Sequence, residues 1–539
     1  MLYSTLSSIP SHKLGGKTYN ASRKILWLWI FVNVLLFLIY LSTISIAPYM
    51  HPDELMTVDL GRVILYPNTN WSIAWLTDKN QPVVSLFYVG PVLQELAYEF
   101  VGQYGPRIFA LIGALFAANM LRQWFLARGT SQNLSFLLSL VFLLDPLFVQ
   151  SYTMGRIDGW AMGLSLTACW LIRAANNDLS QRIFLKRRFI LAGGLMVLAL
   201  FTWPSAIFLA PLVLYEMMVL ISKYRSINIH RKSVPLPAIL FITGSLILGI
   251  FLIITIAPYL FTKSGNVIQS ITTNTHSGSA NKSFNFFDLF ASVKEVFSVL
   301  KFTPVLSVMA FLGIIQKRDA GLIVSAMAAT VLMICTLVYI QRVQYLLPYL
   351  VIFTAEMYSE NHKMKKKEAW RRIKLVGLPL LLCWCICLSI FVRTILALDK
   401  KEGRNRDLIY HAAQLMIGNG THNVFAPYEF YYTARSLNWK LYGPYIPMND
   451  SFSLTTLRKI LPHVDYIIMR SSAGMSPEFV KELDKNDMHS QGIYNIYNEP
   501  VQNFDGITTN VTRLRNLYSI FRQPYGPYEL YVRETPVTH

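Results

Sequence analysis

Long apolar runs dominate the chain and predict helices that span a membrane. The first run, residues 25–47, carries no charge over a length sufficient to cross a bilayer. A cleavable signal peptide is the alternative, but its apolar core would be shorter, and no small-residue cleavage site precedes the "HPDE" stretch that follows. The runs together predict a polytopic α-helical membrane protein with about eleven transmembrane helices. The predicted helices lie near residues 25–47, 106–127, 133–150, 157–174, 189–206, 207–222, 236–259, 295–315, 320–340, 344–358 and 375–397.

Basic residues gather in short segments between these runs. The formal net charge is +19, which by itself would suggest nucleic acid as a partner. The charge, however, lies before the first run, near residues 182–188 and 223–232, and most densely in "HKMKKKEAWRRIK" at 362–374. Such clusters mark the cytoplasmic loops of membrane proteins. We therefore assign residues 1–24 and these loops to the cytoplasm and expect no nucleic acid partner.

The composition changes to that of a soluble protein after the last apolar run. "RDLIYHAAQLMIGNG" predicts a helix closed by glycine, "HNVFAP" and "VDYIIMR" predict buried strands, and "PEFVKELDKND" predicts another helix. We expect a transmembrane domain at 25–397 and a C-terminal soluble α/β domain at 398–539. An odd number of spans that starts inside places this domain outside the cytoplasm. The domain has no glycine-rich nucleotide motif.

The first outer loop, residues 48–105, contains two predicted helices. One begins at Pro52, a residue suited to a first helical turn, and continues with apolar residues on one side. The other belongs to a second apolar stretch that contains Glu95 and Glu99. A spanning helix rarely turns two carboxylates to lipid, so this stretch is predicted to lie along the membrane surface.

Asp53 and Glu54 start the first of these helices. Acidic residues are ordinary in a first turn, where the helix dipole favours their ionised form. Ionisable groups at a membrane boundary are also common functional sites. A carboxylate there that faces a polar cavity could act as a general base toward a hydroxyl. Both interpretations stand on the sequence alone.

Two further stretches at the outer boundary carry candidate site residues. In "YTMGRIDGW", Arg156 and Asp158 either form a loop salt bridge or serve a substrate, with Arg156 on a phosphate and Asp158 on an acceptor or a bound cation. In "QRVQYLLPYL", Arg342 and Tyr345 lie where the positive-inside bias disfavours a basic residue. Arg342 either snorkels to the interface or contacts a substrate phosphate. The five cysteines form no metal or disulfide framework.

These features together resemble polytopic glycosyltransferases of the GT-C fold. They are the first helix with its N-terminus inside, the Asp-Glu pair, "QPVVSLFY" followed by "GPRIFALIGALFAANMLRQWFL", "QRVQYLLPYL" and the outer C-terminal domain. The layout is most similar to the group of dolichyl-phosphate-mannose protein mannosyltransferases and aminoarabinose transferases. "HPDE" also resembles a second GT-C branch, the mannosyltransferases of lipid-linked glycan and GPI-anchor assembly, but the "HKEERF"-like segment of that branch does not occur here.

The resemblance implies an inverting transfer of a hexosyl or pentosyl group from a polyprenyl-phosphate-linked donor on the outer face of a membrane. Asp53 matches the first acidic residue of the family pair, in the role of general base, and Glu54 would support it. Arg342 is similar to the residue that faces the lipid phosphate, and Arg156 is a second match. The acceptor, whether lipid, glycan or protein, stays open, and so does a divalent cation as cofactor.

Three alternatives remain at this stage. A transporter or flippase would favour charges near the membrane midplane and two equivalent halves, neither of which the sequence shows. A ligase or polymerase of lipid-linked glycans shares the donor class. A receptor or structural membrane protein would leave Asp53 dispensable. The short loops favour the plasma membrane of a prokaryote over an ER membrane.

Overall fold

A computed structural model describes the chain at residues 16–46, 50–67, 85–177, 182–227, 236–262, 286–336, 340–358, 368–398, 401–442, 454–470, 477–495 and 525–534. Parts of several predicted segments lie outside the described residues. These parts are the chain before residue 16, the middle of the first outer loop, most of a further predicted outer segment at 261–290, and much of the basic segments at 223–232 and 362–374.

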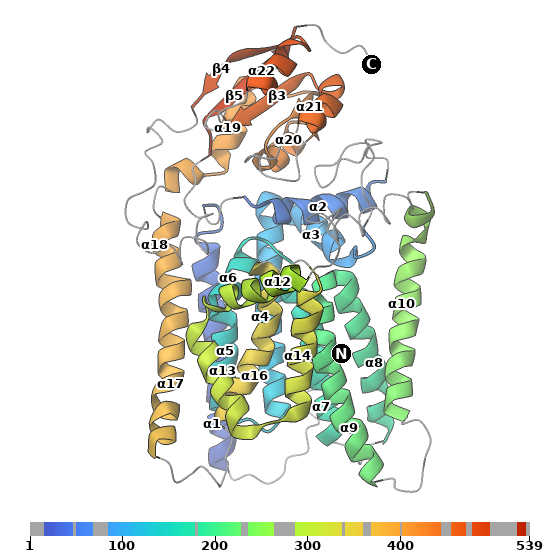
Figure 1. The fold of residues 1–539 in the computed structure, drawn as a ribbon, viewed down its shortest axis with the longest axis vertical. Coiled ribbons are helices and arrows are strands. Elements are labelled where there is room, and N and C mark those ends of the chain that lie inside the picture. Colours follow the sequence, from blue (N-terminus) through green and yellow to red (C-terminus); the bar gives the residue numbers. More distant parts are fainter. Residues whose placement is uncertain are drawn as a thin grey trace.

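Helices stand side by side in a bundle, and the C-terminal region, residues 401–534, lies beyond one end of it, called the upper end here (Figure 1). The bundle helices are α1 (Gly16–Leu41), α4 (Gly105–Ala127), α5 (Gln132–Leu144), α6 (Pro146–Thr153), α7 (Asp158–Asn177), α8 (Arg182–Thr202), α9 (Ala210–Ile227), α10 (Leu236–Thr262), α13 (Pro304–Lys317), α14 (Ala320–Ile334), α15 (Ile340–Val343), α16 (Leu347–Tyr358), α17 (Glu368–Ile386) and α18 (Arg393–Leu398). Helix α12 (Phe286–Leu300) lies across the upper part of the bundle (Figure 1).

Several of these helices suit a membrane. Within the described part of the chain, the stretches long and apolar enough to cross it are Arg23–Leu41, Val89–Ala127, Pro204–Tyr224, Leu236–Pro258 and Arg372–Leu398. These are five possible membrane spans in the described residues, and the number of possible spans becomes seven if each of two bent helix pairs is counted as one span. Large apolar side chains such as Ile247 and Ile254 are exposed along α10, as on a lipid-facing helix. The count of about eleven spans stays a prediction.

Two predicted spans are broken in the structure. The run at 133–150 forms α5 and α6, which meet at 57°, and the run at 295–315 forms part of α12 and α13, which meet at 106°. In each pair the second helix begins with a proline, Pro146 or Pro304. The residue before a proline is disfavoured in the helical conformation, which explains why α5 ends just before Asp145. Helix α12 already ends at Leu300, before the residue that precedes Pro304.

Helix α2 (Pro52–Leu65) and helix α3 (Val89–Val101) pack on each other at the upper end of the bundle (Figure 1). Helix α2 begins at Pro52, as predicted, and His51 caps it by accepting a hydrogen bond from the Asp53 N–H at 3.2 Å on Nδ1. The helix is covered on more than its predicted apolar side. All residues of α2 from Glu54 to Ile64 are buried, because the C-terminal region covers the helix from above.

Helix α3 leads through the short helix η1 (Gly102–Tyr104) directly into α4. The carboxylate of Glu95 is buried against Arg435 of the C-terminal region, and that of Glu99 accepts a hydrogen bond from Tyr66. Neither carboxylate therefore needs to face lipid. The position of this stretch along a membrane surface stays a prediction.

A mixed sheet forms the centre of the C-terminal region. Its strands are β1 (Asn423–Phe425), β2 (Lys440–Tyr442), β3 (Tyr466–Arg470), β4 (Met488–Tyr494) and β5 (Tyr528–Arg533), in the order β2-β1-β3-β5-β4. Strand β1 is parallel to β2 and β3, and β5 is antiparallel to β3 and β4. The helices are α19 (Asp407–Met416), η6 (Tyr428–Phe430), α20 (Tyr431–Ser436), α21 (Leu454–Ile460) and α22 (Pro477–Asp484). The predicted elements α19, β1, β3 and α22 are confirmed.

The C-terminal region shares an apolar core with α2. Met50, Leu55 and Val58 belong to the same buried cluster as Phe430 and Leu530 of the C-terminal region. Burial of apolar surface is the main favourable term in such packing. Helix α2 is therefore held from above by the C-terminal region as well as from below by the bundle.

Candidate active site at the start of helix α2

Asp53 lies in the first turn of α2, with 21% of its side chain exposed. Its Oδ2 accepts a hydrogen bond from Nη1 of Arg156, which stands in the turn before α7. Burial raises the pKa of the Asp53 carboxyl, but the charges of Arg156 and His51 and the Arg156 hydrogen bond outweigh it. The pKa therefore lies below its usual value, and Asp53 is a carboxylate at neutral pH.

Arg156 connects Asp53 to the second acidic residue of its loop. Its Nε donates to Oδ2 of Asp158 at 2.7 Å, and its guanidinium carbon lies 5.8 Å from the centre of a Trp203 ring. The other Asp158 oxygen, Oδ1, accepts a hydrogen bond from the Tyr345 hydroxyl at 2.9 Å. The structure thus brings four predicted site residues, Asp53, Arg156, Asp158 and Tyr345, into one series of contacts.

Arg342 is another predicted site residue. It lies in α15, three positions before Tyr345. Its side chain is half-buried, and its charge acts on the Tyr345 hydroxyl. The short helix η3 (Gln344–Leu346) continues α15 into α16. Arg342 is therefore a cation beside the series of contacts that starts at Asp53.

Glu54 belongs to a different network from its neighbour Asp53. Its side chain is fully buried, and Oε2 accepts a hydrogen bond from Nε of Arg107 at 3.0 Å. From the C-terminal region, Arg406 Nη2 donates to Oε1 at 3.2 Å and the Tyr432 hydroxyl donates to the same oxygen at 3.3 Å. Burial raises the pKa of Glu54, but the two guanidinium charges outweigh it and hold the pKa below its usual value.

The sequence did not identify Arg107 and Arg406. Arg107 stands in the first turn of α4, at the outer boundary of a predicted span. A basic residue there works against the positive-inside bias, the same signal that singled out Arg342. Arg406 follows the last apolar run in "GRNRD" and offers no such signal.

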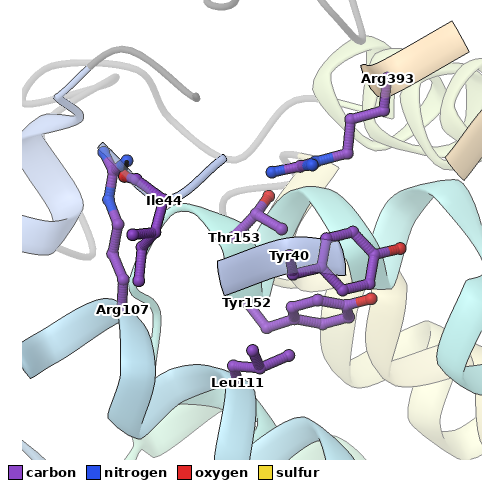
Figure 2. A pocket seen from close by; sticks show the side chains of 7 residues that line it. All are labelled: Tyr40, Ile44, Arg107, Leu111, Tyr152, Thr153 and Arg393. Carbon is purple, nitrogen blue, oxygen red and sulfur yellow. Dashed lines mark hydrogen bonds between the residues drawn. The ribbon is translucent and has the colours of Figure 1, made fainter. Parts of the chain in front are cut away.

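A small pocket lies beside Arg107 (Figure 2). It is narrow and partly open to solvent. Arg393 points into it near the Thr153 hydroxyl, and its Nη1 donates to Thr43 Oγ1 at 3.0 Å. The lining residues are Tyr40, Ile44, Arg107, Leu111, Tyr152, Thr153 and Arg393. We assign no substrate to this pocket.

The acidic side chains of this site contact arginines. Within the ranges that the structure describes, no group of three or more His, Cys, Asp or Glu residues is placed to hold a metal ion. Asp53 and Asp158 share Arg156 as their cation instead.

The chain has the GT-C fold, which defines a class of membrane glycosyltransferases. It is similar to ArnT from Cupriavidus metallidurans bound to undecaprenyl phosphate, with a TM-score of 0.55, 11% identity, and coverage of 86% of this chain and 96% of that chain. It is also similar to the arabinofuranosyltransferase AftD from Mycobacteria, with a TM-score of 0.50 and 12% identity, over 95% of this chain and 40% of that chain. No protein-family model and no curated protein matches the sequence.

The shared fold agrees with the apolar helices, and the protein is an integral membrane protein. At these low identities the likeness concerns the fold alone. The roles of the site residues, the plasma membrane and the extracytoplasmic side of the upper end stay predictions.

Proposed function

We propose that this protein is an inverting glycosyltransferase. In this proposal it transfers a sugar from a polyprenyl-phosphate-linked donor to a hydroxyl group at the upper end of the bundle, on the outer face of the membrane. The observation that carries the proposal is Asp53, a partly exposed carboxylate held by Arg156 at the boundary between the bundle and the C-terminal region. The GT-C fold supports it, and so does the undecaprenyl phosphate that the similar ArnT binds.

The proposed reaction is a single in-line displacement. Asp53 accepts the proton of the acceptor hydroxyl while the hydroxyl oxygen bonds to the anomeric carbon. The bond between that carbon and the phosphate oxygen breaks, and the lipid phosphate leaves with the electron pair. Because Asp53 is ionised at neutral pH, it can act as a base without prior loss of a proton.

Arg156 and Arg342 are the cations proposed to serve this reaction. Asp158 holds Arg156 in place and is itself held by the Tyr345 hydroxyl, and Arg156 in turn orients Asp53. Arg342, which is half-buried beside them, is assigned to the lipid phosphate. A fixed guanidinium stabilises the charge that develops on the leaving phosphate without reorganisation of solvent.

Glu54 is proposed to support Asp53 indirectly. It is fully buried and already holds two arginines and a tyrosine, so it has no room for a substrate hydroxyl. Its ion pairs fix the start of α2 relative to α4 and the C-terminal region. The position of Asp53 depends on these contacts, while proton transfer is assigned to Asp53.

Transfer of a labelled sugar by the purified full-length protein tests the proposal, with a panel of polyprenyl-phosphate hexoses and pentoses as donors. We expect Asp53→Asn to lower kcat by about 10²- to 10⁴-fold, the usual contribution of a general base. Arg342→Ala should raise the KM for the donor. Arg458→Gln, which removes the exposed partner of Glu482 in the C-terminal region, is the control and should leave transfer unchanged.

Two results would overturn parts of the proposal. Undiminished transfer by Asp53→Asn would remove the general-base assignment. Failure of the native protein to use any polyprenyl-phosphate sugar would exclude the reaction and favour the transporter or glycan ligase alternatives.

A further inference from the structure

Helix α12 lies across the upper part of the bundle, below α2 and α3, instead of along the bundle axis (Figure 1). Its residues Ser292–Leu300 meet α13, one of the bundle helices, at 106°. Because α13 belongs to the bundle that crosses the membrane, a helix nearly perpendicular to it runs in the plane of the membrane. Helix α12 is therefore oriented like a helix that lies in a membrane surface.

The length of α13 sets the depth of α12 in the membrane. Helix α13 has 14 residues, which at 1.5 Å per residue makes it about 21 Å long, and its lower end is Lys317. The hydrocarbon core of a bilayer is about 30 Å thick, and interfacial helices bury their apolar face roughly 5–10 Å into its boundary. The two lengths together match the thickness of the core. Helix α12 therefore lies at the depth where acyl chains meet headgroups.

One side of α12 packs on the protein. Val296 and Val299 are buried and belong to the main apolar core of the bundle. The helix contacts α14 and also α15, the helix that carries Arg342. These contacts fix α12 on the bundle and turn its opposite side outward.

The outward side of α12 carries an aromatic ring between two lysines. Phe297 is 69% exposed. Lys294, three positions earlier, and Lys301, four positions later and just past the end of the helix, are also exposed. Positions three and four apart share one side of a helix, whereas Glu295, two positions before Phe297, is exposed on another side. The side that carries Phe297 is therefore apolar in its centre and positively charged at its margins.

We propose that this side of α12, defined by Lys294, Phe297 and Lys301, binds the headgroups of anionic phospholipids in the leaflet at the upper end of the bundle. The Phe297 ring enters the acyl chains, and the two ammonium groups extend on their alkyl stems to the lipid phosphates. An anionic lipid suits the lysines better than a zwitterionic one, because no choline balances its phosphate. The orientation and depth of α12 favour lipid over a second copy of the chain as the occupant.

Fluorescence quenching by brominated lipids tests the position of Phe297 in the full-length protein. In a variant whose five native cysteines are replaced by alanine, Phe297→Cys carries a bimane label, and the protein is reconstituted in phosphatidylcholine nanodiscs. Lipids brominated near the glycerol should quench this label more than lipids brominated near the chain ends. Phe311→Cys, 61% exposed on α13, is the matched control, and chain-end bromines should quench its label more.

The role of the two lysines is tested with the same label at position 297. Brominated phosphatidylglycerol in a phosphatidylcholine membrane should quench it more than an equal amount of phosphatidylcholine with the same bromines. In Lys294→Gln/Lys301→Gln, this preference should fall at least about fivefold, the usual effect of one lysine at an anionic membrane surface. Lys481→Gln/Lys485→Gln removes two exposed lysines of the C-terminal region and should retain the native preference.

Each part of the experiment has a result that would overturn the inference. Absence of quenching by every brominated lipid would show that water or protein covers this side of α12. Equal quenching by the two lipids, or an unchanged preference in Lys294→Gln/Lys301→Gln, would exclude binding of anionic headgroups by the lysines. Thermal unfolding checks that each variant is folded. The measurement needs no sugar donor and no transfer, so its outcome is independent of that of Asp53→Asn.

Discussion

At the scale of single residues, Asp53 and Glu54 show how two adjacent carboxylates receive opposite surroundings. Successive side chains on a helix point in different directions. Asp53 is partly exposed and pairs with Arg156, whereas Glu54 is fully buried between Arg107 and Arg406. The geometry thus separates a group that a substrate could reach from a group that holds the structure together.

Loss of the Glu54 charge should destabilise the protein strongly. Glu54→Gln leaves Arg107 and Arg406 buried without their counter-charge, and breaking a buried ion pair costs about 3–5 kcal/mol. We expect a marked decrease in the thermal unfolding midpoint of the detergent-purified protein. Arg458→Gln, which removes the exposed partner of Glu482, should leave the unfolding midpoint almost unchanged.

The same contact predicts a pH dependence. Because the pKa of Glu54 is lower in the folded than in the unfolded protein, its contribution is complete above the unfolded pKa of about 4.3 and is lost as the pH falls through the folded pKa. The unfolding midpoint of the native protein should fall on acidification below about pH 5, and that of Glu54→Gln should fall less steeply. Identical slopes in both proteins would contradict this assignment.

At the scale of elements, α2 and α3 pack closely enough to require glycine. A Cβ atom on Gly61 would overlap the carbonyl oxygen of Pro91 and lie 2.9 Å from Cβ of Glu95. Because Pro91 contributes backbone atoms, a rotamer change cannot relieve the overlap. The distance between the two helices is therefore set by the absence of a side chain at position 61.

Gly61→Ala should push α2 away from α3 and destabilise the protein by about 1–3 kcal/mol, as extra atoms do in packed interiors. Gly249→Ala on α10 is the matched control, since the added Cβ meets only Val197 Cγ1 at an ordinary 3.7 Å. Thermal unfolding of both variants measures the difference. An unchanged midpoint in Gly61→Ala would show that the two helices can separate at little cost.

Local signals in the sequence predicted some element boundaries and missed others. Pro52 correctly marks the start of α2, because its ring suits a first helical turn. Pro146 and Pro304 carry the signal for the two broken runs, but hydrophobic periodicity continues across both of them. A reading by periodicity alone therefore joins helices that the structure separates.

The partners of the candidate site could not be predicted in the same way. Glu54 and Arg406 are 352 positions apart, and Asp53 and Arg156 are 103 positions apart. Only the packing of α2 against the bundle and the C-terminal region brings them together. The sequence indicated which boundary residues to consider, whereas the pairing of each residue needed the fold.

At the scale of the whole molecule, buried charges hold both ends of the bundle. Glu216 in α9 pairs with Arg128 and Arg173 at 2.8 and 2.6 Å, and Arg128 also reaches Glu356 of α16 at 2.9 Å. The upper end has the network around Glu54 and the pair of Glu95 with Arg435. The C-terminal region is therefore attached to the bundle by ion pairs as well as by an apolar core.

The predicted orientation places the C-terminal region outside the cytoplasm. In a variant whose five native cysteines are replaced by alanine, Leu415→Cys on α19, 79% exposed, should react with a membrane-impermeant maleimide in intact cells. Asn133→Cys, exposed at the start of α5, should react only after the membrane is permeabilised. The reverse pattern would invert the topology and place Asp53 on the cytoplasmic side.

The burial of α2 has a consequence for the depth of the reaction centre. Bilayers differ in thickness, and spanning helices adjust by tilting or bending. Residues 54–64 of α2 touch protein on all sides, so contacts with α4 and the C-terminal region, rather than lipid headgroups, set the height of Asp53. The Asp53 carboxylate, the proposed base, therefore keeps a constant depth relative to the protein when the lipid composition of the membrane changes.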